Sequence, residues 1–334
     1  PFGRCTQKTL KRRALIAGKK GGSHAVTRLY LHVFRWPDNK KLSVPGIYNK
    51  ALKAYLLADP RQSKLPVSRV EDSLVITVPE TAPDPIDTVV VLDLTGKPDV
   101  NNPPEITAET GIFIDRLQVR IASEREDVEI RFTLDGTAPG AASPSATGPL
   151  QITKTTTVTA RCFRDGKAVS GSTQGTFTRV TPVEPVKTKQ ALNQGVTYTC
   201  YQGEWDQLPD FTALAPVKKG KAGHFDLSPR SREDYFGFEY TGYIRIPRDG
   251  VYLFYTDSDD GSRLYIGEKL VVDNDGLHGL TEKQGVIALV KGLHPIRVTY
   301  FEKTGGNELK VSYKGPGIKK QQIPGSVLFS QPIR

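Results

Sequence analysis

Cysteine and methionine are nearly missing from this sequence. Its 334 residues include no methionine and only three cysteines, Cys5, Cys162 and Cys200, none in the CxxC spacing of a zinc or redox motif. The odd number leaves at least one thiol unpaired within the chain, and the sequence leaves open whether the other two form a disulfide. Because the chain begins at Pro1 and has no methionine, we expect it to come from a longer precursor.

Recognisable catalytic motifs are also missing. There is no Ser-His-Asp elbow, no HExxH helix and no phosphate loop. The five histidines are dispersed along the chain: His24, His32, His224, His278 and His294. A catalytic (β/α) barrel needs about 250 residues of alternating strands and helices, and no such segment is present. We therefore predict that this chain has no active site of its own.

Long apolar runs and, near the start, acidic residues are absent. No window approaches the ~18 apolar residues of a membrane helix, so we expect no membrane span. The first 37 residues carry nine of the 46 basic residues and no acidic one, which accounts for most of the formal net charge of +10. Nucleic-acid readers carry their basic patch on a folded face. We therefore expect residues 1–27 to form a basic arm, loop-like or mobile over residues 4–20, with no nucleic-acid partner.

Proline and glycine are plentiful and divide the chain into short segments. The runs between them are β-branched or aromatic, which is typical of strands. Two proline-rich stretches, residues 96–106 and 181–190, indicate linkers. We predict an all-β fold in which two small antiparallel β-sandwiches, at residues 28–98 and 107–180, precede a larger antiparallel barrel or sandwich at residues 191–334.

Alternation along the predicted strands assigns side chains to faces. Within residues 28–36, Leu29, Leu31 and Val33 fall on one face. His32 falls on the other face with Trp36, which is compatible with a platform for a sugar or with a buried histidine in an aromatic-rich sheet. Further on, residues 251–266 predict a hairpin that turns through residues 257–261.

Several motifs of the first predicted sandwich occur together and in a fixed order. Residues 28–98 contain RLYLHVFRWP, KLSVPGIYNKALKAYLLAD and APDPIDTVVVLDLTGKP, and they resemble the C-terminal β-sandwich of family 29 α-L-fucosidases. Residues 1–6, PFGRCT, look like the segment that leaves the catalytic barrel of those enzymes. The basic segment 10–26 is longer than the usual turn of that family. The catalytic carboxylates of the family lie on its barrel, so the resemblance assigns no catalytic residue to this chain.

The two later domains resemble other modules. Within residues 129–179, the motif RFTLDGTAPGAASPSATGPLQITKTTTVTARCFRDGKAVS resembles the chitobiase/hexosaminidase C-terminal sandwich, which implies a spacer. Residues 195–332 resemble the protective-antigen-type β-barrel of toxins, adhesins and glycosidases. The motifs that carry this resemblance are DYFGFEYTGYIRIPRDGVYLFYTDSDDGSRLYIGEKLVVDNDGLHG and KGLHPIRVTYFEKTGGNELKVSYKGPG.

Together the resemblances imply the non-catalytic C-terminal region of a secreted or periplasmic α-L-fucosidase. Its expected partner is the catalytic barrel of the same precursor, which the sandwiches would brace, and its last module would bind glycan. Two alternatives stay open: a purely structural or protein-interaction array, and a calcium-dependent lectin or adhesin.

Asp259 and Asp260 are the only adjacent aspartates in the chain. Sugar-binding adhesins similar to the last module use such a pair, joined by a cis peptide, to bind calcium, which in turn binds sugar hydroxyls. The resemblance thus makes both residues candidate metal and carbohydrate ligands, because calcium takes six to eight hard oxygens. Further oxygens are expected from among Asp257, Asp273, Asn274, Asp275 and Asn307.

A simpler interpretation needs no metal. Asp-Gly favours tight turns, so Asp260-Gly261 would merely close a hairpin. Trp205 and Tyr235 are weaker candidates for stacking against a sugar ring, and burial in the core of the module is the competing interpretation for both.

Overall fold

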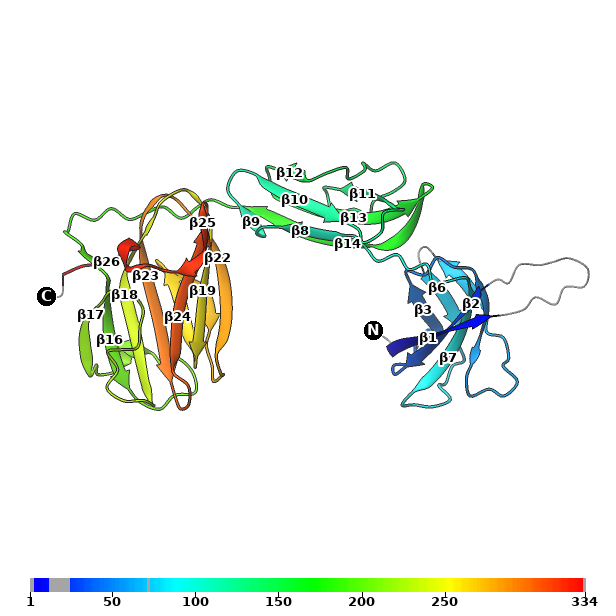
Figure 1. Ribbon diagram of the computed structural model, residues 1–334, viewed down its shortest axis with the longest axis horizontal. Helices are drawn as coiled ribbons and strands as arrows, with labels where there is room; N and C mark the ends of the chain where they lie inside the picture. The colour runs from blue at the N-terminus through cyan, green and yellow to red at the C-terminus, as the bar shows by residue number, and fades with distance from the viewer. Residues whose placement is uncertain (1–2, 12–24, 71–72, 333–334) are drawn as a thin grey trace, which may run out of the picture. The chain divides into compact units, whose positions relative to one another are not determined.

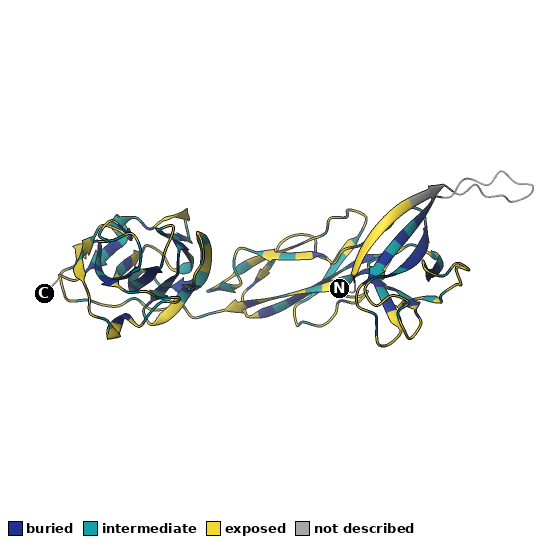
Figure 2. Ribbon diagram, turned by 90° about the horizontal axis from the view of Figure 1, so that it is seen from below, coloured by how far each residue is buried: buried dark blue, intermediate teal, exposed yellow. Residues whose placement is uncertain are grey.

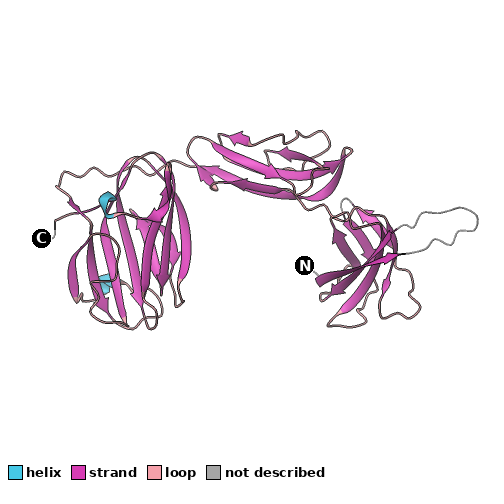
Figure 3. Cartoon of the chain, in the orientation of Figure 1, coloured by secondary structure: helices cyan, strands magenta, loops and turns pink. Residues whose placement is uncertain are grey.

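The computed structural model describes residues 3–11, 25–70 and 73–332, and the regular elements of this part of the chain are almost all strands, as predicted (Figure 3). Its helices are two short 3-10 turns, η1 (Phe211–Ala213) and η2 (Gly325–Val327). No helix among the described residues is long and apolar enough to cross a membrane. The chain divides into two compact units, Pro1–Glu109 with Gln118–Thr176 and Thr110–Leu117 with Phe177–Arg334.

The first sandwich consists of two antiparallel sheets (Figure 1). One has the order β1-β2-β7-β4, from β1 (Gly3–Lys11), β2 (Ala25–Val33), β7 (Thr88–Thr95) and β4 (Ala51–Leu56). The other has the order β3-β6-β5, from β3 (Lys41–Pro45), β6 (Ser73–Thr77) and β5 (Val67–Val70). The predicted inward residues Leu29, Leu31 and Val33 are buried between the sheets, so the predicted face is confirmed.

The expectation of a loop-like basic arm is wrong for its first part. Residues 3–11 form β1, which pairs with β2 from Gly3 opposite Val33 to Lys11 opposite Ala25. This backbone pairing orders the segment even though it is basic, because the charged side chains Arg4 and Lys8 point to solvent. The rest of the predicted arm, residues 12–24, lies outside the described residues.

His32 is not the buried histidine of one interpretation, and the sugar-platform interpretation stays a prediction. It is half-buried, and its Nδ1 lies 2.9 Å from a carboxylate oxygen of Asp87. All three cysteines are free, with Cys162 and Cys200 buried and Cys5 exposed.

The second sandwich also has two sheets. Its first sheet has the order β12-β10-β8, from β12 (Leu150–Ile152), β10 (Leu117–Ala122) and β8 (Glu105–Ala108). Its second sheet has the order β11-β13-β14-β9, from β11 (Glu129–Thr133), β13 (Thr156–Arg164), β14 (Lys167–Arg179) and β9 (Ile112–Phe113). Asp165 and Gly166 connect β13 to β14 with φ angles of 50° and 72°, the left-handed values of a tight hairpin turn.

The C-terminal module is the largest sandwich. Its main sheet runs β15-β26-β18-β23-β20-β21, with β16 paired to β18 and β17 paired to β16. The bounds are β15 (Asn193–Gln194), β16 (Val196–Gln202), β17 (Lys218–Ala222), β18 (Phe236–Ile246), β20 (Ser262–Ile266), β21 (Lys269–Asn274), β23 (Gly292–Glu302) and β26 (Leu328–Ser330). The facing sheet runs β22-β19-β24-β25, from β22 (Thr281–Leu289), β19 (Gly250–Asp259), β24 (Glu308–Gly315) and β25 (Ile318–Gln322).

An aromatic core fills the space between these two sheets. Tyr240, Tyr252, Phe254 and Tyr300 are fully buried in it. Buried positions alternate with half-buried or exposed ones along strands such as β20 and β24, as expected for sheets with one face on a core. In Figure 2 the buried residues of the module gather in its interior.

The predicted hairpin between residues 251 and 266 is wrong. Both edges of β19 are taken, by β22 and β24, whereas β20 pairs with β21 and β23 in the opposite sheet. The chain therefore crosses from one sheet to the other at residues 259–261 instead of turning back on itself. This crossing places Asp259 and Asp260 at one end of the module.

Candidate functional site

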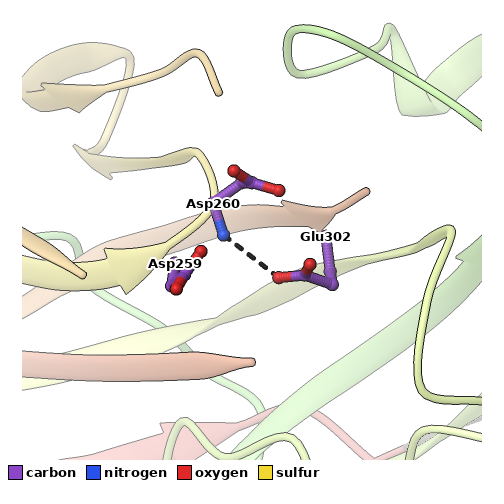
Figure 4. Close-up of side chains that lie close together, drawn as sticks. All are labelled: Asp259, Asp260 and Glu302. Atoms are coloured by element: carbon purple, nitrogen blue, oxygen red, sulfur yellow. Dashed lines mark hydrogen bonds between the residues drawn. The ribbon is translucent and has the colours of Figure 1, made fainter. Parts of the chain in front are cut away.

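Three carboxylates meet at the sheet crossing. Oxygen atoms of Asp259, Asp260 and Glu302 lie within 4.8 Å of one another, as the close-up in Figure 4 shows. The first two come from the end of β19 and the third from the end of β23. Because Ser262 on β20 pairs with Tyr300 on β23, the chain before β20 runs beside the residues that follow Tyr300.

Backbone amides from two distant loops hold the side chain of Asp260, which is only 5% exposed. Its Oδ1 accepts a hydrogen bond from the His278 amide at 3.0 Å, and its Oδ2 accepts one from the Lys303 amide at 3.1 Å. Its own amide donates to Glu302 Oε2 at 3.2 Å. These partners are 18 to 43 residues away, so a local Asp-Gly hairpin turn does not explain the residue.

Asp259 is half-buried at the same place, and the Asp259-Asp260 peptide is cis. The hydroxyl of Tyr300 donates to its carbonyl oxygen. A Cβ atom built on Gly306 would lie 2.6 Å from Asp259 Oδ2, so the loop before β24 passes directly against this carboxylate. Burial, and next the charge of Asp260, raise the pKa of Asp259.

Glu302 completes the cluster and was not among the residues predicted from the sequence. Its side chain is fully buried, and its Oε1 has no hydrogen-bond partner among the described residues. Burial raises its pKa to about 7, and the charges of Asp260 and Asp259 act in the same direction. A signal was available: Ile296, Val298 and Tyr300 form an inward-facing row with period two, and Glu302 is the next member of that row.

Two of the other candidate oxygens lie unpaired inside the protein. Asn274 is fully buried and donates its amide to Ser258 and Thr281, while its Oδ1 has no partner in the described part of the chain. Asn307 Oδ1 is likewise buried and unpaired. Asn307 precedes Glu308, whose Cα pairs with that of Asp259.

The remaining candidates are engaged elsewhere. Arg263 pairs with Asp273 at 2.9 Å and with Asp275 at 3.1 Å. Asp275 also accepts from the amide of Leu208, which ties the loop after β16 to the loop after β21. Asp257 is half-buried within β19 and lies outside the cluster.

Trp205 and Tyr235 are not buried in the core, so that interpretation is wrong for both. Both are half-buried, and neither belongs to the core cluster of the module. Trp205 makes an edge contact with Phe211 at 6.2 Å. The amide of Tyr235 donates to the carbonyl of Lys303, the residue whose own amide holds Asp260.

The donor set fits a hard cation. The described cluster offers only carboxylate oxygens, the ligand type that calcium prefers over sulfur or imidazole. An unpaired carboxylate oxygen inside a protein costs free energy, and a cation held by Asp259, Asp260 and Glu302 would offset this cost. Asp259 is the most exposed of the three, so solvent reaches the cluster on its side.

Comparison with known proteins gives two domain matches. Residues 192–326 match the PA14 domain, and residues 108–174 match the chitobiase/beta-hexosaminidase C-terminal domain. The second match falls on the sandwich for which the sequence motifs indicate the same resemblance.

Individual relatives are distant. A beta-hexosaminidase of Porphyromonas gingivalis is 25% identical over 207 residues, which are 56% of this chain and 25% of that protein. The anti-sigma-I factor RsgI3 of Acetivibrio thermocellus is 25% identical over 134 residues, which are 38% of this chain and 21% of that protein. The chain thus spans a quarter or less of the length of these relatives. A solved PA14 sugar-binding domain from an RTX adhesin is 16% identical, with a TM-score of 0.35 over 42% of this chain and 99% of that one.

The two domain matches and the hexosaminidase relative define the class. The chain is a β-sandwich region of the kind associated with glycoside hydrolases. The narrower α-L-fucosidase assignment of residues 28–98 stays a prediction.

Proposed function

We propose that this chain is a non-catalytic accessory region of a glycoside hydrolase and that its C-terminal module binds glycans through a calcium ion. The observation that carries the proposal is the cluster of Asp259, Asp260 and Glu302, in which a fully buried carboxylate oxygen has no partner among the described residues. The PA14 match over residues 192–326 supports it.

The protein's own part in binding is to hold the ligand oxygens in place. The amides of His278 and Lys303 fix both oxygens of Asp260 before any ligand arrives, and such preorganisation lowers the cost of binding. A bound calcium ion would supply coordination positions for the hydroxyls of a sugar.

The proposed setting follows from the relatives and motifs. We infer a secreted or periplasmic parent enzyme, with an α-L-fucosidase barrel in the same precursor as the partner of the first sandwich. The motif resemblance of residues 28–98 supports the fucosidase, and the beta-hexosaminidase relative supports a glycoside hydrolase more generally. Sequencing the gene upstream of Pro1 tests this, because an in-frame barrel of another glycosidase family would replace the fucosidase.

Calorimetric titration of calcium into the chelator-treated chain tests whether the cluster binds calcium. We expect one site in the wild type and none in an Asp259→Asn/Asp260→Asn variant, which keeps the shape of both side chains. Asp273→Asn is the matched control, because this carboxylate is exposed and pairs with Arg263 outside the cluster. A wild-type chain that takes up no calcium would falsify the metal-based proposal.

A glycan array tests the sugar. The full chain is applied with calcium and with chelator, and we expect binding that the chelator abolishes and that the double Asn variant lacks. Calcium binding without any glycan binding would favour the purely structural alternative for the C-terminal module.

A further inference from the structure

A groove lies on the first sandwich, on the outer face of the sheet β3-β6-β5. It has a volume of about 970 Å³ and is lined by the segment 35–39 and by residues from all three strands. Ligand pockets in proteins commonly have volumes of this size. The inner face of the same sheet packs on the core through Leu42, Val44, Leu74 and Ile76. The outer face, which carries the groove, takes no part in that packing.

Strand register explains the shape of the groove floor. Val75 on the central strand pairs with Ser43 on one side and with Ser68 on the other. This row therefore presents three small side chains in line across the sheet, and Lys41 and Thr77 form the next row. A floor of small side chains leaves space above it that a flat sheet covered by large residues would fill.

Trp36 forms one wall and is held in position. Its indole Nε1 donates to the carbonyl oxygen of Pro79 at 2.9 Å, and its ring packs partly against the core. The next residue, Pro37, is buried, which fixes the chain at this point. The part of the indole that remains exposed is thus a preorganised apolar surface beside polar neighbours.

Most polar side chains of the groove have no recorded partner among the described residues. The structure records no hydrogen bond or ion pair with described residues for six of its lining side chains: Arg35, Asp38, Lys41, Ser43, Ser68 and Thr77. Hydroxyl groups both donate and accept, the guanidinium and ammonium groups donate, and the carboxylate accepts. The groove therefore offers both kinds of hydrogen-bonding partner along one face.

We propose that this groove is a second carbohydrate-binding site, one that takes an oligosaccharide without a metal ion. A sugar chain presents hydroxyls that both donate and accept, together with apolar C–H faces, and the exposed apolar part of the indole, beside free polar side chains, is suited to such a ligand. Apart from Trp36, the apolar lining residues are only Pro37, Val70 and Val75, too few for the apolar anchors on which protein interfaces depend. Two basic groups and one acidic group are also too few for a nucleic-acid footprint.

The two tryptophans of the chain make the test direct. In a nitrogen-15 NMR spectrum of the full chain, Trp36 and Trp205 give two indole signals, which a Trp205→Phe variant assigns. The probes are chitotetraose, xylotetraose and a fucosylated pentasaccharide, with a heparin tetrasaccharide to test for an acidic ligand. Chelator is present throughout, so the proposed cation site of the C-terminal module contributes no binding. The result for the groove therefore does not depend on whether the calcium proposal is right.

We expect at least one probe to shift the Trp36 signal in a saturable way while the Trp205 signal stays in place. Ser68→Tyr fills the groove floor at an exposed strand position that tolerates tyrosine, and it should weaken binding by about tenfold or more. Ser172→Tyr, at an exposed position of β14, is the matched control and should bind as the wild type. The proposal is overturned if no probe moves the Trp36 signal, or if Ser68→Tyr binds as tightly as the control.

Discussion

Glu302 connects the stability of the C-terminal module to pH. Burial raises its pKa to about 7 from the ordinary 4.5. Because the folded protein holds this proton more tightly than the unfolded chain does, the contribution of the group to stability is complete below pH 4.5 and is lost as the pH rises through 7. In cation-free protein we expect this to lower the free energy of unfolding by roughly 3 kcal/mol across that window.

Denaturant unfolding of wild type and Glu302→Gln, measured with chelator from acidic to neutral pH, checks this. A glutamine at this position keeps an oxygen that can accept the Asp260 amide, and it does not titrate. The difference between the two plots of unfolding free energy against pH therefore reports the titration of Glu302 without that of the other carboxylates. Parallel curves across the window would show that Glu302 has an ordinary pKa.

Gly306 leaves room for the carboxylate of Asp259. A Cβ at this position would lie 2.6 Å from Asp259 Oδ2, the far end of a flexible side chain. We therefore expect Gly306→Ala to reorient that carboxylate and to weaken calcium binding by about tenfold, with little effect on folding.

Gly279→Ala is the control for this change, since nothing lies within 4 Å of its Cβ position and its loop also borders the cluster. Calcium titration and thermal melting of both variants check the prediction. Equal calcium affinity in the two would remove Asp259 from the ligand set.

At this scale the sequence predicted part of the site. Asp259 and Asp260 are neighbours in the sequence, so the sequence alone was enough to predict both as candidate ligands. Glu302 lies 42 residues further along and comes beside them only through the pairing of β20 with β23. A sequence pattern shows that such a residue faces inward but not which residue it meets.

Among the elements, β21 and β22 come close together at a glycine. Gly285 lies on β22, and a Cβ there would be only 1.6 Å from the carbonyl oxygen of Val271 on β21. These strands are the edges of the two facing sheets, so the contact closes one side of the sandwich.

We expect Gly285→Ala to destabilise the module by roughly 2–3 kcal/mol, because backbone atoms must move to admit the methyl group. Gln284→Ala, at the exposed neighbouring position on the same strand, should change stability little. Denaturant unfolding of the two variants is the measurement, and equal stability would mean that the sheets separate here without cost.

The elements that the sequence predicted well are those defined by local pattern. Alternation along residues 28–36 was enough to predict that Leu29, Leu31 and Val33 share one face, and all three are buried between the sheets. The prediction of a hairpin between β19 and β20 was wrong because strands that are distant in the sequence compete for the same edges, and β22 and β24 occupy both edges of β19. The basic segment failed as a loop because its partner β2 orders it, and a charge count does not detect a partner.

For the whole molecule, we predict that the purified chain hydrolyses neither aryl fucosides nor aryl N-acetylglucosaminides. Retaining glycosidases place two carboxyl groups about 5 Å apart on opposite sides of the scissile bond. In the described carboxylate cluster, backbone amides hold both oxygens of Asp260, and Asp260 and Glu302 are buried, so they are not placed on two sides of a substrate bond. Turnover above a buffer blank that disappears with a point substitution in this chain would contradict the prediction.

In the strand order β1-β2-β7-β4, β1 lies at the margin of its sheet, and this position gives its basic residues a consequence for solubility. A marginal strand exposes a row of backbone N–H and C=O groups that the strand of a second molecule can bind, which is how fibrils and other aggregates begin. The exposed charges of Arg4 and Lys8 on this strand oppose such addition, since an incoming copy would bring the same charges alongside. Anyone who removes these residues to lower the isoelectric point would therefore risk precipitating the protein.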